Sequence, residues 1–310
     1  MKIAIIGPGA MGLFFAARLQ QSGQEVWLVD YRPERAAHLR REGLNLEEID
    51  GTTHHFPLQV TTDVTIIGPC ELGMLMVKSH QTRAAAQALP PLLAGGGIAL
   101  TVQNGIGNLE VMAEVAGADR LLAGVTMLGV TRLAAGHIRH AGQGPVILGI
   151  PPHSRVSPQE LALIVQVFSQ AGLDCRAEPD IMTVLWQKLL INVGINPVTA
   201  LTRLSNGCLP EIAAAWEVVS AAVLEAQAVG LAAGLPLPPE PLARVRQVCE
   251  ATAANRSSML QDILKQRPTE IDALNAQIVA HGQRLGIPTP TNTILTDLIK
   301  ALEKGQPELT

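Results

Sequence analysis

Three polar residues recur at four-residue intervals in an otherwise apolar segment: Lys188, Asn192 and Asn196. In a helix this spacing places the three side chains along one face. Amides bind a buried ligand or orient an ammonium, whereas a solvated helix face more often carries Glu or Lys. The stripe therefore indicates a binding site with one cation. The structural alternative is a surface lysine whose stem packs on the apolar face of the helix.

A second polar cluster lies further along the chain and contains Ser258 and Glu270. Capping boxes explain its hydroxyls equally well, since the spacing fits for Ser258 with Gln261 and for Thr269 with Asp272. Glu270 is expected in a first helical turn, where the helix dipole favours the ionised carboxylate. That carboxylate can hold a substrate hydroxyl or pair with Lys188, and the sequence does not show that the two residues meet.

The N-terminus carries a glycine motif, Gly7-Pro8-Gly9-Ala10-Met11-Gly12. An apolar run precedes it, helical spacing of apolar residues follows it, and a second apolar run ends on Asp30, 18 residues after Gly12. Gly7 permits a tight turn, Gly9 a close approach of a pyrophosphate, and Gly12 close packing of helix on strand. The helix N-terminus then offers N–H groups and a positive dipole end to phosphates. Strand, glycine turn, helix and acid together predict a dinucleotide site.

Further apolar runs at residues 74–77 and 98–102 alternate with helical patterns, which predicts a parallel sheet. Lys78 directly follows the first run, and Asn104 stands two residues after the second, so both are expected at the sheet edge that holds the glycine turn. Ser79 is expected to cap a helix that Pro90-Pro91 stops, and Gly51 marks a hairpin turn. The glycine-rich stretch 121–150 is predicted to add antiparallel strands at the sheet edge.

After Asp180 the strand signals end. Helices are predicted over residues 181–195, 210–233, 241–253, 259–265, 270–285 and 292–303. We therefore predict two domains, a Rossmann-like α/β domain over residues 1–178 and an all-α domain over residues 179–310.

The amino-acid composition favours an enzyme over a protein that binds nucleic acid or membranes. The chain has 310 residues, a net charge of −4, 47% hydrophobic and 16% charged residues, which fits a two-domain α/β enzyme. Without a basic face, neither nucleic acid nor a membrane surface is an expected partner. The Ala-rich stretch 212–235 approaches membrane length, but Glu217, Glu225 and Gln227 favour a helix buried in the protein.

The four cysteines lie far apart in the sequence, at Cys70, Cys175, Cys208 and Cys249. They form no CxxC pair, and no histidine stands at metal-ligand spacing from them. Reduced thiols in the cytoplasm, without a metal site, are the expectation.

Together these motifs resemble the ketopantoate reductase (2-dehydropantoate 2-reductase) family. The likeness covers residues 1 to about 290 and rests on residues 7–12, Val77-Lys78, Gln103-Asn104-Gly105, Lys188-x3-Asn192-x3-Asn196-Pro197, Asn206-Gly207, 256–262 and 269–272. It implies a Rossmann domain joined to a helical domain like that of 6-phosphogluconate dehydrogenase, with an active site between them. It also implies reduction of 2-dehydropantoate to (R)-pantoate by NADPH, a step of pantothenate and coenzyme A biosynthesis.

The resemblance assigns a role to each residue. Lys188 is similar to the family's general acid, which protonates the ketone oxygen as hydride arrives, and Glu270 to the partner of the substrate hydroxyl. The residues that resemble the family's substrate-binding groups are Asn192, Asn196, Asn206 and Ser258. Asn104 resembles the residue at the nicotinamide end, and Lys78 a lysine near the adenosine phosphate. A cationic donor suits a developing alkoxide, and desolvation would lower its pKa.

The sequence departs from the family at the end of the second strand. Many members place an arginine there for the 2′-phosphate of NADPH, whereas this chain has Asp30-Tyr31-Arg32. Asp30 would favour the free ribose hydroxyl of NADH, while Arg32 and Lys78 can neutralise a phosphate. NADPH therefore remains the expected cofactor, with NADH as the alternative.

Two other functions stay open at this stage: a reductase of a different branched 2-keto acid on the same fold, and a nucleotide sensor without turnover. A nucleotide sensor would need none of the polar residues of the second domain, so the presence of these residues argues against this function. The apolar C-terminal helices suggest a homodimer.

Overall fold

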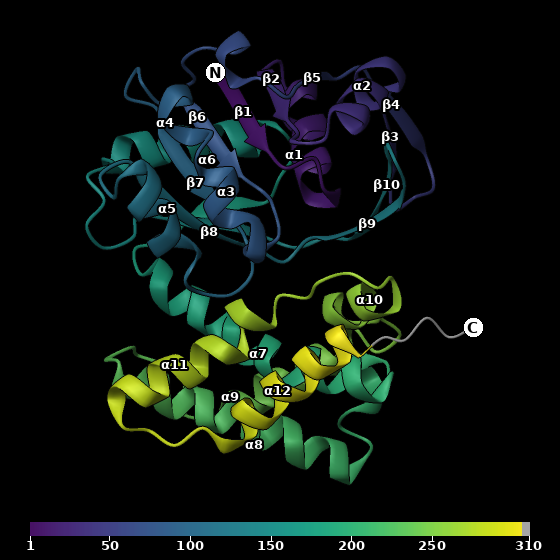
Figure 1. Ribbon diagram of the computed structural model, residues 1–310, viewed down its shortest axis with the longest axis vertical. Helices are drawn as coiled ribbons and strands as arrows, with labels where there is room; N and C mark the ends of the chain where they lie inside the picture. The colour runs from purple at the N-terminus through teal and green to yellow at the C-terminus, as the bar shows by residue number, and fades with distance from the viewer. Residues whose placement is uncertain (306–310) are drawn as a thin grey trace. The chain divides into compact units, whose positions relative to one another are not determined.

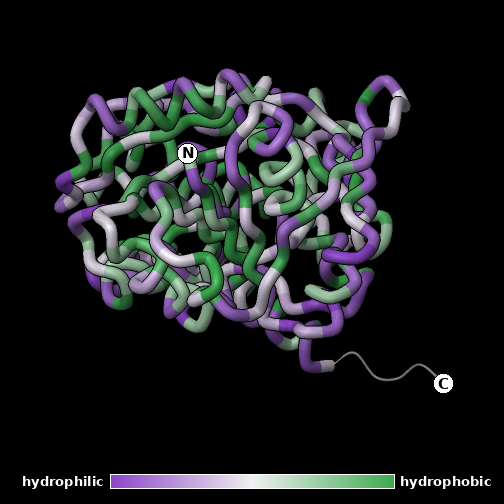
Figure 2. Tube along the Cα trace, turned by 90° about the horizontal axis from the view of Figure 1, so that it is seen from above, coloured by the Kyte–Doolittle hydropathy of each residue, from purple (hydrophilic) through white to green (hydrophobic). Residues whose placement is uncertain are grey.

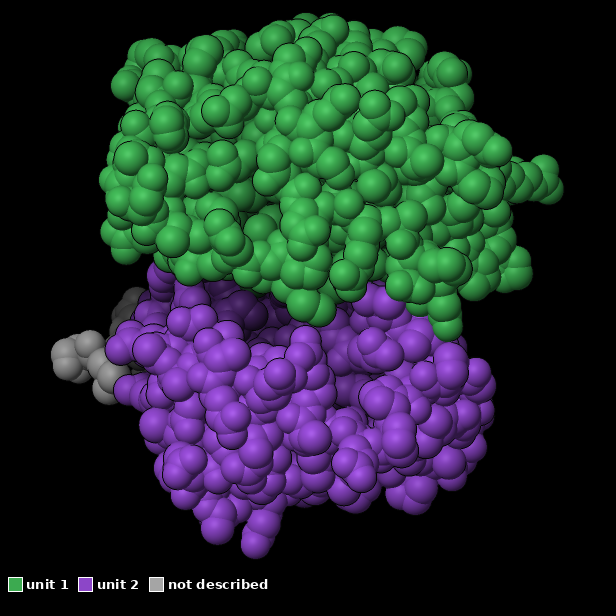
Figure 3. Space-filling view, turned by 180° about the vertical axis from the view of Figure 1, so that it is seen from behind, with its two compact units in different colours: residues 1–103, 108–181 green, residues 104–107, 182–310 purple. Residues whose placement is uncertain are grey.

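The computed structural model describes residues 1–305, and the chain divides into two compact units (Figure 3). The first unit comprises residues 1–103 and 108–181, and the second comprises residues 104–107 and the chain from Met182 onward. The chain thus leaves the first unit at residue 104 and returns to it at residue 108. The predicted boundary after residue 178 stays a prediction, and the last five residues of the predicted second domain lie outside the described residues.

An eight-stranded sheet forms the centre of the first unit, with the strand order β12-β11-β8-β7-β6-β1-β2-β5 (Figure 1). Its strands are β1 (Lys2–Ile6), β2 (Glu25–Val29), β5 (Gln59–Thr61), β6 (Leu72–Leu75), β7 (Ile98–Thr101), β8 (Leu121–Thr126), β11 (Val146–Gly149) and β12 (Cys175–Ala177). All neighbours pair in parallel except β8 and β11. The predicted Rossmann-like sheet is confirmed, and its strand order reverses between β1 and β6, where doubly wound sheets bind ligands.

Both faces of this sheet are buried. Along β1, Ile3 and Ile5 belong to one hydrophobic core, while Ala4 and Ile6 belong to another, because successive side chains of a strand point to opposite faces. The covering helices are α1 (Ala10–Gln21), α2 (Pro33–Glu42), α3 (Thr82–Ala86), α4 (Leu89–Leu92), α5 (Asn108–Ala116) and α6 (Pro158–Gln170). In Figure 2, hydrophobic stretches run through the middle of the trace, while protruding loops are mostly hydrophilic.

A second, four-stranded sheet has the order β4-β3-β10-β9. It contains β3 (Leu44–Glu47), β4 (Thr53–Phe56), β9 (Gly129–Ala134) and β10 (His137–Gly142). The hairpin at Gly51 is confirmed, with a φ of 86° at the glycine. The prediction for residues 121–150 is wrong in part: β8 lies inside the main sheet beside β7, and the β9–β10 hairpin belongs to the small sheet. Glycine spacing predicts strands but carries no information on which sheet they join.

The segment after β6 also differs from its prediction. Ser79 begins a short 3-10 helix, η2 (Ser79–Gln81), whose capping position is Lys78. Pro90 and Pro91 lie in the first turn of α4 instead of ending the preceding helix. A first turn accepts proline because its N–H groups have no partner inside the helix. Another short 3-10 helix, η1 (Val64–Ile66), precedes β6.

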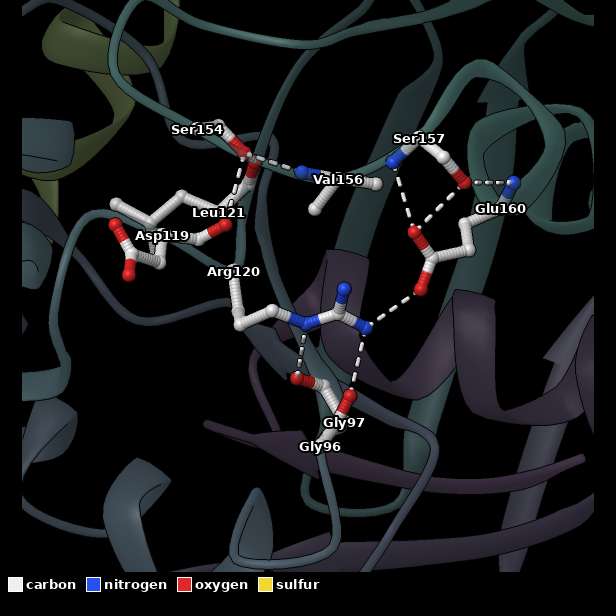
Figure 4. Close-up of polar contacts among 9 residues, drawn as sticks. All are labelled: Gly96, Gly97, Asp119, Arg120, Leu121, Ser154, Val156, Ser157 and Glu160. Carbon is white, nitrogen blue, oxygen red and sulfur yellow. Dashed lines mark hydrogen bonds and ion pairs between the residues drawn. The ribbon is translucent and has the colours of Figure 1, made fainter.

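Arg120 holds the amino-terminal edge of the sheet together (Figure 4). Its Nη2 donates to the carbonyl of Gly96 at 2.6 Å and to Oε1 of Glu160 at 2.7 Å. Glu160 also completes a capping box with Ser157 at the start of α6. The hydrogen bond from Arg120, followed by those from Ser157, lowers the pKa of Glu160 to about 2.

The second unit is helical and contains α7 (Ile181–Thr202), α8 (Ala213–Ala232), α9 (Pro241–Ala251), α10 (Ser258–Leu264), α11 (Asn275–Leu285) and α12 (Pro290–Lys304). Short 3-10 helices, η3 (Asn206–Cys208) and η4 (Ile271–Ala273), connect them. The predicted all-α architecture is confirmed, with two corrections. α7 continues through Pro197 beyond its predicted end at residue 195, and the helix predicted over residues 270–285 divides into η4 and α11.

Within residues 1–305, α8 is the one helix with the length and hydropathy of a membrane span, and 44% of its apolar window is buried. Val219, Val223 and Ala226 pack in the core of the unit, whereas Leu224 and Leu231 are about half exposed. The expectation of a buried helix therefore holds for one face only. The homodimer stays a prediction.

Candidate functional site

The glycine turn joins β1 to α1, and each of its three positions needs a glycine for a different reason. Gly7 has a φ of 104°, and a Cβ at Gly12 would lie 2.2 Å from the carbonyl oxygen of Gly7. The fold itself therefore requires Gly7 and Gly12. At Gly9 a Cβ would meet nothing closer than 4.0 Å, so the protein alone gives no steric reason for this glycine. Close approach of a ligand would explain it.

Substitution by alanine separates these reasons. Gly12→Ala is expected to lower the free energy of unfolding by about 1–3 kcal/mol, because the new Cβ overlaps a backbone oxygen. Gly9→Ala is expected to retain wild-type stability and to weaken binding of a reduced nicotinamide dinucleotide at least about tenfold, or 1.4 kcal/mol. Urea unfolding and fluorescence titration measure the two effects. Equal cofactor binding in Gly9→Ala and the wild type would contradict the phosphate-turn interpretation.

Asp30 stands at the end of β2 and is buried. Both carboxylate oxygens accept hydrogen bonds from Arg35, and Oδ1 also accepts from the backbone N–H of Arg32 at 3.0 Å. The hydrogen bond to Asp30 in turn raises the pKa of Arg35. The role of Asp30 toward a ribose hydroxyl stays a prediction, and the structure adds that a guanidinium compensates this carboxylate within the protein.

The exposed surface next to Asp30 is basic and aromatic. The Tyr31 side chain is 60% exposed, and its hydroxyl accepts hydrogen bonds from Nε of Arg32 at 2.8 Å and from Gln81 at 3.3 Å. The guanidiniums of Arg32 and Arg35 lie 5.2 and 5.8 Å from the Tyr31 ring centre. Gln81 belongs to the turn that follows Lys78, so the structure links this turn to the end of β2. Sequence reasoning missed Tyr31, Arg35 and Gln81, although Arg35 stands only three residues after Arg32.

The second unit contains the other predicted site residues. Residues 104–107 dock on η4: the N–H of Ile106 donates to the carbonyl of Ala273 at 3.0 Å. Gly105, with a φ of 80°, permits this approach, because a Cβ there would lie 2.1 Å from the same oxygen. Asn104 Nδ2 then donates to Oε2 of Glu270 at 3.2 Å. The structure thus brings together two residues that stand 166 positions apart.

Lys188 lies half-buried on α7 and interacts with Glu270. Burial lowers the pKa of Lys188 from 10.5 to about 8, and the negative charge of Glu270 opposes that shift. Glu270 itself is buried, at the capping position of η4. The sequence left open whether Lys188 and Glu270 interact, and in the structure the charge of Glu270 acts on Lys188. Along the same face of α7, Asn192 is half-buried and Asn196 is buried.

Both predicted capping boxes are wrong. The cap of α10 is Ser257, whose Oγ accepts from the N–H of Leu260 at 3.1 Å and from Thr199 at 2.7 Å. Ser258 is exposed in the first turn of α10, so capping does not account for its hydroxyl. Thr269 accepts from the N–H of Ile271, while Asp272 forms an ion pair with Lys300 at 2.6 Å.

Asn206 is buried in η3, and its Nδ2 donates to Thr252 at 2.9 Å. Its Oδ1 is buried without a hydrogen-bond partner within the described part of the chain. A Cβ at Gly207 would lie 2.5 Å from the Cβ of Ala253, so this glycine lets η3 approach the end of α9. No hydrogen bond joins Asn206 to Lys188 or Glu270 among those observed in residues 1–305.

Two further observations concern alternative sites. A cavity of about 440 Å³ lies at the amino-terminal edge of the main sheet, beside Arg120, Glu160 and Cys70. In open parallel sheets ligands bind at the opposite, carboxyl edge, where the glycine turn lies. Among residues 1–305 no group of three His, Cys, Asp or Glu side chains is arranged to hold a metal ion, and the four cysteines are free thiols.

Comparison with known proteins adds family relationships. Residues 3–153 match the family described as ketopantoate reductase PanE/ApbA, and residues 180–303 match its C-terminal family. The chain is 33% identical over 304 residues to a 2-dehydropantoate 2-reductase of Halobacterium salinarum, covering 98% of this chain and 99% of that one. It is 32% identical over 307 residues to a protein of the same name in Archaeoglobus fulgidus, covering 98% of each.

Solved structures give the same overall fold. A PanE/ApbA family ketopantoate reductase from Ralstonia eutropha superimposes with a TM-score of 0.89 at 30% identity, covering 99% of both chains. A D-mandelate dehydrogenase, solved with NADH and anilino(oxo)acetate, superimposes with a TM-score of 0.91 at 27% identity, covering 98% of this chain and 99% of that one.

Proposed function

The chain belongs to the ketopantoate reductase PanE/ApbA family, and we propose that it reduces 2-dehydropantoate to (R)-pantoate with NADPH. This reaction is a step of pantothenate and coenzyme A biosynthesis, and we place it in the cytoplasm. The observation that carries the proposal is the charge interaction of half-buried Lys188 with buried Glu270, whose carboxylate also accepts a hydrogen bond from Asn104.

The proposed chemistry needs one hydride and one proton. NADPH, when bound, would be the source of the hydride that adds to the ketone carbon while the electron pair of the carbonyl moves onto its oxygen. Lys188 stabilises the developing alkoxide as an ammonium and gives it a proton. With a pKa of about 8, Lys188 is mostly protonated at neutral pH and yet a stronger acid than an exposed lysine.

Neighbouring residues are assigned to binding and orientation. Glu270 keeps Lys188 charged, binds the substrate hydroxyl and accepts from Asn104, which orients the carboxylate and faces the nicotinamide end. Asn192, Asn196, Asn206 and Ser258 bind the carboxylate and hydroxyl of the keto acid. The glycine turn, with Gly9 as its ligand-facing glycine, binds the pyrophosphate.

NADPH is proposed over NADH because of the charges at the end of β2. Arg35 already compensates Asp30, so a 2′-phosphate would meet a weaker repulsion than the sequence alone suggests. Arg32 is exposed on the Tyr31 ring and can pair with that phosphate, with Lys78 as a second cation.

Arg32→Ala tests this assignment. We expect the KM for NADPH to rise about tenfold, the equivalent of one charge-assisted contact, while the KM for NADH changes little. Arg41→Ala, which removes an exposed guanidinium at the other end of α2, is the matched control. A parallel rise for both cofactors would show that Arg32 does not contact the 2′-phosphate.

A second substrate is favoured by one observation, the similarity to a D-mandelate dehydrogenase solved with NADH. The alternative is an NADH-dependent reduction of a bulkier 2-keto acid in the same site. Oxidation of NADPH and of NADH should be followed by absorbance with 2-dehydropantoate and with phenylglyoxylate as oxidants. Preferred turnover of 2-dehydropantoate supports the proposal, preferred turnover of phenylglyoxylate supports the alternative, and no turnover with any pair contradicts both.

A further inference from the structure

Helix α7 contains a proline in its interior, Pro197, and therefore lacks one backbone hydrogen bond. Residue i of an α-helix donates its N–H to the carbonyl of residue i−4, so the missing donor at Pro197 belongs to Val193. Val193 is fully buried in the core of the second unit. A buried carbonyl without a donor is costly, so this position needs a replacement.

The side chain of Asn275 provides that replacement. Its Nδ2 donates to the carbonyl oxygen of Val193 at 2.9 Å, and Asn275 is fully buried. The same amide nitrogen donates to Oδ1 of Asn292 at 3.0 Å. Asn292 is fixed in turn, since its Nδ2 donates to Ala222 at 3.0 Å and to Glu225 at 2.8 Å. Asn275 is thus held in one orientation between α7 and α12.

The hydrogen bond between Asn275 and Val193 joins two segments that carry residues of the candidate site. Val193 directly follows Asn192 and lies five residues after Lys188 on α7. Asn275 lies five residues after Glu270, and the intervening turn is closed by hydrogen bonds from Ala273 and Leu274 to the carbonyl of Glu270 at 3.0 and 3.1 Å. One buried amide therefore connects the helix that carries Lys188 to the short turn that carries Glu270.

We propose that Asn275 is a positioning residue: its amide replaces the hydrogen bond that Pro197 removes from α7 and thereby fixes Lys188 relative to Glu270. The proposal rests on the proposed function, in which these two residues act together. Asn275 touches neither substrate nor cofactor in this role, so its effect is exerted through Lys188 and Glu270.

A double-mutant cycle with Pro197 tests the proposal. In Pro197→Ala the new N–H can donate to Val193, which makes the Asn275 donor redundant. Asn275→Ala is expected to lower kcat at least tenfold in the wild-type background and much less in Pro197→Ala. Loss of the Asn292 contact and of side-chain volume occurs in both backgrounds and cancels in the cycle.

The pH profile distinguishes positioning from general structural damage. Because Glu270 raises the pKa of Lys188, a larger separation lowers that pKa and moves the alkaline limb of kcat to lower pH. We expect a shift of at least half a pH unit in Asn275→Ala and its reversal in the double variant. Lower stability alone would reduce the amount of folded enzyme without moving the limb.

Two variants and one measurement complete the design. Asn275→Leu nearly keeps the volume and loses the donor without adding a charge, so it replaces Asn275→Ala if the latter does not fold. Thr202→Val removes a hydroxyl bond to Val198 elsewhere on α7 and should show no coupling to Pro197→Ala. The same double-mutant cycle, measured by urea unfolding, gives the coupling free energy between Asn275 and Pro197 independently of turnover.

The outcomes separate the two proposals. Equal effects of Asn275→Ala in both backgrounds, or an unmoved alkaline limb, would overturn the positioning role while leaving the reductase proposal intact. Absence of turnover in the wild-type enzyme would overturn the proposed function and the positioning role with it, even if the urea cycle still showed the hydrogen bond.

Discussion

Replacement of Lys188 by alanine is expected to lower kcat for keto-acid reduction by about 10²–10⁴-fold, the range lost with a general acid. Lys188 is the cation that interacts with Glu270, and a neutral methyl group can neither donate a proton nor stabilise an alkoxide. Cofactor binding should persist, because the glycine turn and the Tyr31 surface belong to the other unit. Steady-state kinetics and cofactor titration on the same preparation measure both quantities.

Gln187→Ala is the matched control for this prediction. Gln187 is the neighbouring residue on α7, but its side chain is exposed. We expect its kcat and KM to stay within twofold of the wild type. Lys188→Ala leaves buried Glu270 without this cation, so its stability is measured by urea unfolding alongside the kinetics. A near-normal kcat of Lys188→Ala would contradict the assignment of Lys188 as the general acid.

Glu270→Gln is expected to lower kcat/KM by about 10- to 10²-fold and to change its pH dependence. The enzyme needs protonated Lys188, so activity is present below the pKa of about 8 and is lost as the pH rises through it. Glu270 raises that pKa, so its neutralisation lowers it further. The alkaline limb should therefore move to lower pH, which pH profiles of kcat at saturating cofactor will show.

Asp272→Asn serves as the comparison, because it removes a carboxylate two residues away. Asp272 pairs with Lys300 on the surface, so its loss should leave the limb in place. A limb that stays fixed in Glu270→Gln, or moves to higher pH, would mean that Glu270 does not act on Lys188. An equal shift in both variants would point to a general effect of net charge.

The parts of the site that depend on local spacing were predictable from the sequence. The helical repeat of Lys188, Asn192 and Asn196 is a property of one helix, and the glycine turn is a property of one strand and the helix after it. Lys188, Asn192 and Asn196 lie on the single helix α7, and α1 starts at Ala10 as the glycine motif requires. Local patterns suffice here because backbone geometry alone sets the spacing.

Side-chain partners and exact helix ends were not predictable in the same way, whether the residues are near or distant in the sequence. The pairing of Asp30 with Arg35 depends on the rotation of α2 against β2, and the sequence-based view of Asp30 as a ribose ligand did not include it. Ser257 instead of Ser258 caps α10, a displacement of one residue that pattern matching does not resolve. The predicted helix stopped at residue 195, and only the folded chain shows that α7 continues through Pro197 and that Asn275, about eighty residues later, supplies a donor for Val193.

The docking of residues 104–107 on η4 has a consequence for attempts to divide the molecule. The second unit is discontinuous in the gene, because its smallest segment is encoded between two strands of the first unit. A fragment that begins at residue 182 would lack the Ile106 donor to Ala273 and the Asn104 amide that holds Glu270. The proposed catalytic half is therefore not a transferable module, and recombination between homologous genes at residue 181 would pair Glu270 of one parent with Asn104 of the other.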